Sequence, residues 1–512
     1  MTQQGEGSIV QAAEPEKEDP VEKKPLNIRL ILCNDGTLNN RKNIEEREKN
    51  SKIYNDFKTD DANSYDNGRT NIAIMEPYLI TEKNDYGGDY DFVFKHYIPG
   101  QGALTHEKDS TPGYALGVGV SGVAARAEEG IKEAMALIMA QIDPTKYYIA
   151  KLTVDVFGFS RGAAAARYAI HVILHGKISN IDSETKKVSY EWSPLAQRLI
   201  DAHYEVKENA VEICFAGLYD TVLSVLGSQK PLLRWLNKAY QQNAVSHAKK
   251  VLHLAAADEH REDFPLHTIK SAKKNGGEEY FLPGVHSDIG GSYNMASETA
   301  LNKEADENKK VYMLASNEGS KEGSDHEPKR NWRGKVKDDS MEINEGDPAA
   351  MKNDRAELIK QGWYAENETT CHDDKWDEYG NATHSYLTAS RQNISSAYCN
   401  IPLKIMAEYA RKPEVKLKID DKLEDRANKI LGADTNLSAF EQKIKSYIAN
   451  NKDSKPEDWI GDEALIKYPE LKAIRHAHFH FSASKTSVGY APNFELDKSS
   501  GKNRRRRAYV DA

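Results

Sequence analysis

The stretch "VDVFGFSRGAAAARYAI", residues 154–170, joins a short apolar run to an alanine-rich segment through Gly-Phe-Ser-Arg-Gly. The apolar run predicts a buried strand over 150–159, and the alanine-rich segment predicts a helix over 163–175. Gly-x-Ser-x-Gly between a strand and a helix is typical of a nucleophile elbow, a strained turn that exposes a serine hydroxyl. Small residues must flank such a serine, and both flanking glycines are present. We therefore interpret Ser160 as a nucleophile.

The alternative is that Ser160 only caps the following helix, since serine is a preferred N-cap residue. A capping box would add Glu or Gln three residues later, where this chain has Ala163. The sequence therefore favours the nucleophile.

Other apolar runs predict strands over 26–37, 211–220 and 278–284, and helical spacing recurs between them, as over 119–142. Strands that are nearly all apolar and alternate with helices indicate a parallel sheet covered on both faces. Together with the elbow, this pattern predicts an α/β-hydrolase-like fold: a mostly parallel sheet with helices on both faces, plus helical and charged insertions.

The composition changes along the chain and suggests five parts. The first part is acidic and poor in large apolar residues, which is typical of disorder. The parts are a disordered leader (1–24), a catalytic core (25–300), a charged insertion that is a candidate lid or membrane-association module (301–393), a helical region returning to the core (394–490) and a basic tail (491–512).

Overall charge and hydropathy exclude several classes of protein. The formal charge of −9 is spread over 512 residues, so nothing indicates a nucleic-acid partner. No apolar run reaches the ~18 residues that span a membrane, and the N-terminus lacks a signal-peptide core. We expect synthesis in the cytoplasm, with another machine carrying the protein outside. The four cysteines do not resemble a disulfide framework.

A serine nucleophile needs a histidine base and an acid that orients it, and in this fold the chain order is Ser, acid, His. Asp220 stands at the end of the strand after the elbow helix, and His286 follows the next predicted strand in a glycine-rich loop. These two residues are the predicted acid and base. Asp258 and Asp288 are rival acids, although Asp288 better suits fixing the loop of His286.

The remaining histidines are weaker candidates for the base. His171 lies inside the predicted elbow helix, and no glycine-rich loop accompanies His253 or His260. In "RHAHFH" (475–480), alternation along a strand would put three histidines on one face, and His480 is the second choice as base. Cysteines or carboxylates at ligand spacing are missing there, so we expect neither a metal nor another cofactor.

The oxyanion of acyl transfer needs preorganised donors. The backbone N–H of Arg161 is one candidate, and the N–H of Gly36 or Thr37 in "CNDGT" is the other. The same turn resembles the Asp-x-Asp-Gly-Thr signature of haloacid-dehalogenase phosphatases. Cys33 stands where that signature has its nucleophilic aspartate, which argues against a phosphatase.

The segment "SQKPLLRWLNKAYQQ" (228–242) predicts an amphipathic helix after the acid loop. Lys230, Arg234 and Lys238 form a basic row, and Trp235 lies on the apolar stripe. Such a helix suits an anionic membrane surface and a lid position. The simpler alternative is a surface helix packed on the core.

Seven motifs in one order carry a resemblance to a known family: "NDGTLNN", "RTNIA", "YIPGQG", "GFSRGAAAAR", "GLYDTV", "DEHREDF" and "PGVHSDIGGSY". From about residue 27 to 295 the chain resembles the uncharacterised α/β-hydrolase domain family of the class-one antibacterial lipase effectors of type VI secretion. The similarity is weaker over 394–485. Tyr219 and Leu38 depart from the family pattern at positions without a chemical role.

The resemblance implies that Ser160, Asp220 and His286 form the triad of a phospholipase A acting on membrane glycerophospholipids of a rival bacterium. It also implies a cognate immunity lipoprotein, a type VI secretion spike as carrier, and delivery to the periplasm or membrane of the target. Two alternatives stay open at this point. One is an esterase or thioesterase for small soluble esters, and the other is a non-catalytic binding protein on a hydrolase scaffold.

Overall fold

A computed structural model represents the chain. It describes residues 22–57, 63–110, 121–181, 188–223, 236, 238–293, 341–346, 348–376, 379–389, 391, 394–481 and 508–509.

The centre of the molecule is a seven-stranded sheet whose paired strands all run parallel. Its order is β10-β8-β7-β3-β1-β2, with the short β6 beside β3. The strands are β1 (Lys24–Asn34), β2 (Phe92–Ile98), β3 (Tyr147–Phe159), β6 (Glu205–Val206), β7 (Val211–Tyr219), β8 (Lys250–Ala256) and β10 (Glu278–Leu282). The predicted parallel sheet is therefore present.

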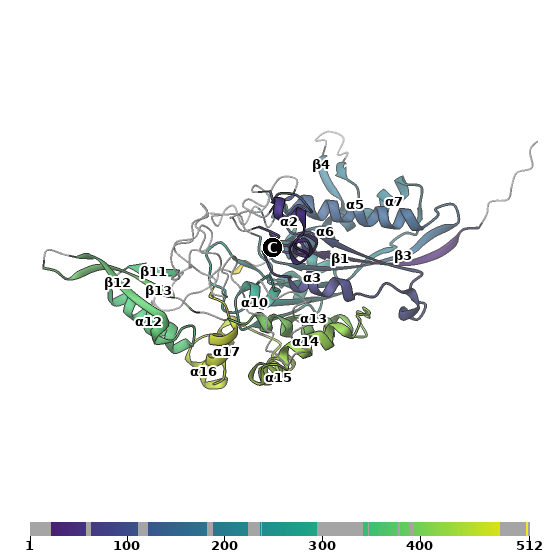
Figure 1. Ribbon diagram of the computed structural model, residues 1–512. Coiled ribbons are helices and arrows are strands. Elements are labelled where there is room, and N and C mark those ends of the chain that lie inside the picture. Colours follow the sequence, from purple (N-terminus) through teal and green to yellow (C-terminus); the bar gives the residue numbers. More distant parts are fainter. Residues whose placement is uncertain are drawn as a thin grey trace, which may run out of the picture.

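Helices cover both faces of this sheet (Figure 1). Leu30 and Leu32 of β1 share one core with α5 (Val123–Gln141) and α6 (Arg161–His175). Ile31 and Cys33 point to the other face and share a second core with α13 (Asn400–Ala410), α14 (Lys422–Leu431) and α15 (Thr435–Asn450). This alternation follows from the two-residue period of a strand that is buried on both sides.

A buried ion pair within the sheet also forms hydrogen bonds to the segment that follows α13. Arg29 of β1 bonds Asp155 of β3 at 2.7 Å, and both side chains are fully buried. The same guanidinium donates to the carbonyl of Val415 at 2.7 Å and to that of Lys416 at 3.2 Å. The region after α13 thus completes the hydrogen bonding of a charge buried on the sheet.

The structure determines the local conformation of two segments that the sequence left open. The run before Asp258, which the sequence left as helical or extended, forms β8 between β7 and β10. A short apolar run rich in Leu and Ala does not distinguish a buried strand from a helix. The segment whose histidines would alternate along a strand is largely helix α17 (Leu471–His478), which buries Leu471, Ile474, Arg475 and His478 with helical spacing.

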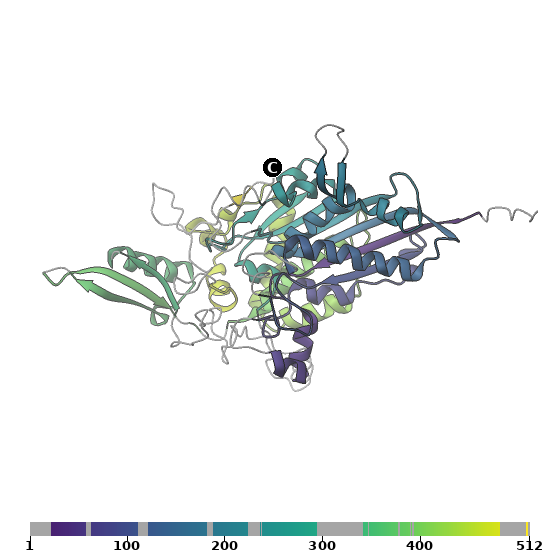
Figure 2. The ribbon, with the colours of Figure 1, turned by 90° about the horizontal axis from the view of Figure 1, so that it is seen from above.

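A second, smaller sheet projects from one end of the molecule (Figures 1 and 2). Its strands are antiparallel in the order β11-β13-β12, and helix α12 packs against it. The bounds are β11 (Met341–Gly346), α12 (Pro348–Gln361), β12 (Thr369–Trp376) and β13 (Ala382–Ala389). This unit lies within the predicted insertion 301–393, of which residues 301–340 lie outside the described residues.

The remaining elements are short. The helices are α1 (Arg41–Glu48), α2 (Lys52–Phe57), α3 (Asn71–Met75), α7 (Leu195–Asp201), α9 (Lys270–Lys273), α10 (His286–Gly290) and α16 (Asp462–Lys467). The 3-10 helices are η1 (Glu76–Tyr78), η2 (Lys83–Tyr86), η4 (Gln242–His247), η5 (Glu366–Glu368), η6 (Ser396–Cys399) and η7 (Pro456–Asp458). The remaining strands are β4 (Lys177–Ile181), β5 (Val188–Trp192), β9 (Leu266–His267) and β14 (Ala508–Tyr509). None of the described helices has the length and hydropathy needed to cross a bilayer.

Candidate active site

Ser160 forms a sharp turn between β3 and α6. Its backbone has φ 57° and ψ −129°, a left-handed φ that is uncommon for a residue other than glycine. Its side chain makes no capping hydrogen bond to the helix. The capping alternative is therefore not supported, and the geometry is that of a strained elbow.

The two glycines beside the serine are needed for close backbone contacts. A Cβ on Gly158 would lie 2.5 Å from the Cα of Ala163, and one on Gly162 would lie 2.1 Å from the carbonyl oxygen of Asp35. Both distances are far inside van der Waals contact. The elbow therefore packs directly against the turn that follows β1.

Asp220 and His286 meet at the same edge of the sheet as the elbow. Asp220 directly follows β7, and the N–H of Ser160 donates to the carbonyl of Tyr219 at 3.0 Å. His286 begins α10 after β10. Its Nδ1 lies 2.5 Å from Oδ2 of Asp220, whose Oδ1 accepts from the N–H of Ala256 at 2.8 Å.

Aromatic side chains enclose the imidazole of His286. The ring of Phe159, the residue before the serine, lies 4.6 Å from it between centroids, and that of Phe264 lies 5.0 Å away. The exposed fractions of Ser160, Asp220 and His286 are 6%, 0% and 4%. The site is thus poorly solvated, a setting in which hydrogen bonds and charges act strongly.

The turn after β1 lies beside the start of α6. Nε of Arg161 donates to Oγ1 of Thr37 at 2.8 Å, so the two residues that carry predicted oxyanion donors are neighbours. The N–H of Gly36, the third, donates to Oδ1 of Asp35 at 2.7 Å and is occupied in this structure. The N–H of Arg161 stands at the first position of a helix, where no intrahelical acceptor exists.

Asp35 organises this turn as a buried carboxylate. It also accepts hydrogen bonds from Oγ1 of Thr70 at 2.6 Å and from the hydroxyl of Tyr97 at 2.5 Å. Burial raises the pKa of Asp35 to about 6, although these hydrogen bonds favour the charged form.

The rival acids and the second-choice base have other partners. Asp258 accepts from the N–H of Gly284 at 2.7 Å, and Asp288 accepts from the N–H of Val285 at 2.9 Å. His480 bonds Asp288 rather than Asp220, with Nδ1 2.8 Å from Oδ1. Asp288 therefore lies in α10, two residues after His286, and bonds the backbone just before it, where the sequence predicted a loop.

The sequence did not suggest a role for His253 and Glu279, which support the acid loop. Nδ1 of His253 lies 2.9 Å from Oε2 of Glu279, and Nε2 accepts from the N–H of Thr221 at 3.1 Å. Burial would raise the pKa of Glu279, but the hydrogen bond from His253 and the charge of Lys273 lower it to about 2. The two residues lie in register on β8 and β10, a pairing visible only once β8 is recognised.

The predicted membrane-contact helix lies mostly outside the described residues, including Lys230, Arg234 and Trp235. Lys238 is described and exposed, and Leu236 is buried. Among the described residues, no three His, Cys, Asp or Glu side chains group in a way that suits a metal ion.

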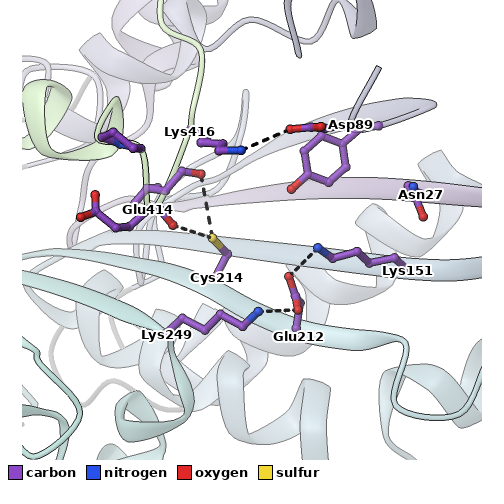
Figure 3. A pocket seen from close by; sticks show the side chains of 11 residues that line it. Asn27, Asp89, Lys151, Glu212, Cys214, Lys249, Glu414 and Lys416 are labelled. Carbon is purple, nitrogen blue, oxygen red and sulfur yellow. Dashed lines mark hydrogen bonds and ion pairs between the residues drawn. The ribbon is translucent and has the colours of Figure 1, made fainter. Parts of the chain in front are cut away.

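A cleft of about 370 Å³ opens at the opposite edge of the sheet, where the strands begin (Figure 3). Glu212 bonds Lys151 at 3.1 Å and Lys249 at 2.7 Å across it, and Lys416 lies 3.7 Å from Asp89. The candidate catalytic residues do not line this cleft. It is therefore separate from the site at the carboxyl ends of the strands.

Comparison with known proteins gives a family match and similar solved structures. The family described as "T6SS, Phospholipase effector Tle1-like, catalytic domain" matches residues 28–315. The chain resembles the solved structure of the Tle1 effector bound to the VgrG spike from the type 6 secretion system, with 18% identity, a TM-score of 0.52 and coverage of 98% of each chain. This likeness confirms the predicted fold.

A second solved structure is an uncharacterised protein from Pseudomonas aeruginosa, with 15% identity and a TM-score of 0.38 over 85% of this chain and 52% of that one. No curated protein matches the chain.

Proposed function

The chain belongs to the Tle1-like phospholipase effectors of the type VI secretion system, and we propose that it is a phospholipase A that uses Ser160, Asp220 and His286. The observation that carries this proposal is the buried hydrogen bond between His286 and Asp220, placed beside a serine in elbow geometry. The three groups follow β3, β7 and β10 at one edge of the sheet, in the chain order that α/β-hydrolases use.

In the proposed reaction, Oγ of Ser160 attacks the ester carbonyl carbon while Nε2 of His286 accepts the hydroxyl proton. Asp220 keeps the proton of the resting imidazole on Nδ1 and stabilises the imidazolium that forms. The negative charge on the carbonyl oxygen is met by the N–H groups of Arg161 and Thr37. His286 then returns its proton to the leaving lysophospholipid, and water hydrolyses the acyl-enzyme to release a fatty acid.

Fluorophosphonate labelling with peptide mapping tests this assignment. We expect one label on Ser160 and none in Ser160→Ala, which should also lose ester hydrolysis while staying folded. His286→Ala should lose nearly as much, and the double variant should be hardly worse because triad members act as a unit. Activity of Ser160→Ala within about tenfold of wild type would refute the assignment. Cleavage of short soluble esters without cleavage of liposomes would instead identify an esterase.

Delivery by a secretion spike is the second part of the proposal. It draws on the family and on the similar structure, in which a Tle1 effector is bound to VgrG. We expect this chain to bind a cognate spike, to reach the periplasm or membrane of target bacteria, and to be neutralised by an immunity lipoprotein. Co-purification with the spike and the lipoprotein from the producing strain tests both partners. Recovery of neither would contradict this part.

Contact with anionic lipid by the segment 228–242 is the third part. Replacing Lys230, Arg234 and Lys238 with Gln should weaken binding to anionic liposomes, because the basic row would meet the headgroups. Hydrolysis of a short soluble ester should stay near wild type. Unchanged liposome binding, or equal loss on both substrates, would show that the segment only packs on the core.

A further inference from the structure

Three consecutive backbone N–H groups at the start of α10 each donate a hydrogen bond to a buried carboxylate. The N–H groups of Gly284, Val285 and His286 donate to Asp258 at 2.7 Å, Asp288 at 2.9 Å and Glu259 at 3.2 Å, respectively. We call this arrangement the amide clamp. It fixes the backbone at the residue whose imidazole meets Asp220.

Each carboxylate of the amide clamp has its own basic partner. Arg475 lies 3.2 Å from Asp258, His480 lies 2.8 Å from Asp288, and Arg261 lies 3.0 Å from Glu259. Arg261 is local, but Arg475 and His480 come from α17 and the residues after it. They are 217 and 192 positions from their partners along the chain.

The basic partners matter because the carboxylates are buried. Burial raises the pKa of Asp258 and of Asp288, and the neighbouring Arg475 and His480 oppose that rise. A charged carboxylate accepts a stronger hydrogen bond from a backbone N–H than a neutral one does. Removing a basic partner should therefore loosen the turn that the carboxylate holds.

We propose that His480 is a positioning residue for catalysis, acting through Asp288 on the turn that carries His286. The inference rests on the proposed function, because it assigns His286 as the base. Its consequence is that the region after residue 394 completes the active site although the catalytic-domain family matches only residues 28–315. His480 itself neither replaces His286 nor contacts Asp220.

The surroundings of His480 define what its imidazole can contribute. The ring of Tyr293 stacks on it with centroids 3.4 Å apart and an angle of 19°, and His480 is fully buried. Its Nε2 has no hydrogen-bond partner among the described residues, which fits a proton on Nδ1, donated to Asp288. The side chain therefore supplies a donor and an aromatic surface, and substitutions can separate the two.

The test compares His480→Asn with His480→Phe in the full-length protein. Asn carries an N–H close to the position of Nδ1 and can still donate to Asp288, but it loses the aromatic ring. Phe keeps a ring to stack on Tyr293 and loses the donor. The measurements are kcat and KM on a short soluble ester, the rate of fluorophosphonate labelling, and the melting temperature.

We expect His480→Phe to lower kcat by about 10- to 100-fold with KM nearly unchanged, because a small displacement of the base slows proton transfer without removing substrate contacts. His480→Asn should recover most of kcat even if its melting temperature is the lower of the two. A purely structural role predicts the opposite order, with the Phe variant more active. That order, or wild-type kcat in His480→Phe, would overturn the inference.

The labelling experiment separates this inference from the proposed function. If Ser160→Ala abolishes labelling while His480→Phe labels at the wild-type rate, the positioning role alone is wrong. If labelling persists in Ser160→Ala, the assignment of the nucleophile is wrong as well.

Discussion

Replacing Asp220 with Asn tests the proposed triad with little change of shape. Asp220 is fully buried, with one oxygen 2.8 Å from the N–H of Ala256 and the other 2.5 Å from Nδ1 of His286. An Asn side chain that keeps its oxygen toward Ala256 presents its NH₂ group to Nδ1. The imidazole then carries its proton on Nε2 and cannot accept the proton of Ser160.

The opposite orientation of the Asn amide, which would restore the productive tautomer of His286, is unfavourable. It would set the NH₂ group against the N–H of Ala256 and leave a buried donor unsatisfied, at a cost of about 1–3 kcal/mol. Its neutral oxygen would also fail to stabilise the imidazolium that forms during the reaction, which adds to the loss. We therefore expect kcat to fall by about 10⁴-fold, the size of loss that follows when a triad histidine holds the wrong tautomer. This loss corresponds to about 5.4 kcal/mol of transition-state stabilisation.

The assay is steady-state hydrolysis of a short soluble ester, with circular dichroism to verify folding. Asp434→Asn is the matched control: Asp434 also bonds a histidine, His478, at 3.1 Å, but it caps α15 away from the site. Asn caps helices as well as Asp does, so this control should keep wild-type kcat. A folded Asp220→Asn variant within about tenfold of wild type would refute the tautomer reasoning.

Three further predictions concern the scaffold around the site. Gly162→Ala should slow fluorophosphonate labelling and lower the melting temperature, because its Cβ would overlap the carbonyl of Asp35; wild-type values for both would contradict the close packing. Asp35 has a folded pKa of about 6, above its ordinary 3.8, so it stabilises the fold most at low pH. That contribution is lost, by about 3 kcal/mol in total, as pH rises through this window. Urea unfolding of Asp35→Asn should lack this decline, and parallel pH profiles would contradict it. Arg29→Met should cost about 3–5 kcal/mol in urea unfolding by leaving Asp155 buried without its partner, and a loss below about 1 kcal/mol would show that the pair is not important.

Local patterns were sufficient for the elbow and for the strands that precede the candidate acid and base. Each combines a short apolar run with a polar or glycine-rich turn at its end, and both signals lie within about a dozen residues of sequence. The parallel sheet followed from the alternation of such strands with helices. These features depend only on residues that are close together in the chain, so they can be predicted from a single sequence.

Features that depend on distant pairing were not predictable in the same way. β8 has no polar alternation because both of its faces are buried. Unless β8 is recognised as a strand, the pairing of His253 with Glu279 cannot be predicted. The histidines after Arg475 alternate as residues on one face of a strand would, whereas the structure buries every third or fourth residue of helix α17. The partners of Asp258 and Asp288 are 217 and 192 positions away, so no local pattern joins them.

The separation of His480 from the turn of His286 also sets an order of events during synthesis. A ribosome that adds about 5–20 residues per second needs roughly 10–40 s to proceed from residue 286 to residue 480. Throughout that interval the nascent chain already contains the proposed serine, acid and base, but Asp288 lacks its partner His480. For a phospholipase effector, the proposed role of His480 means that the cell that makes it meets a fully assembled active site only after nearly the whole chain has been translated.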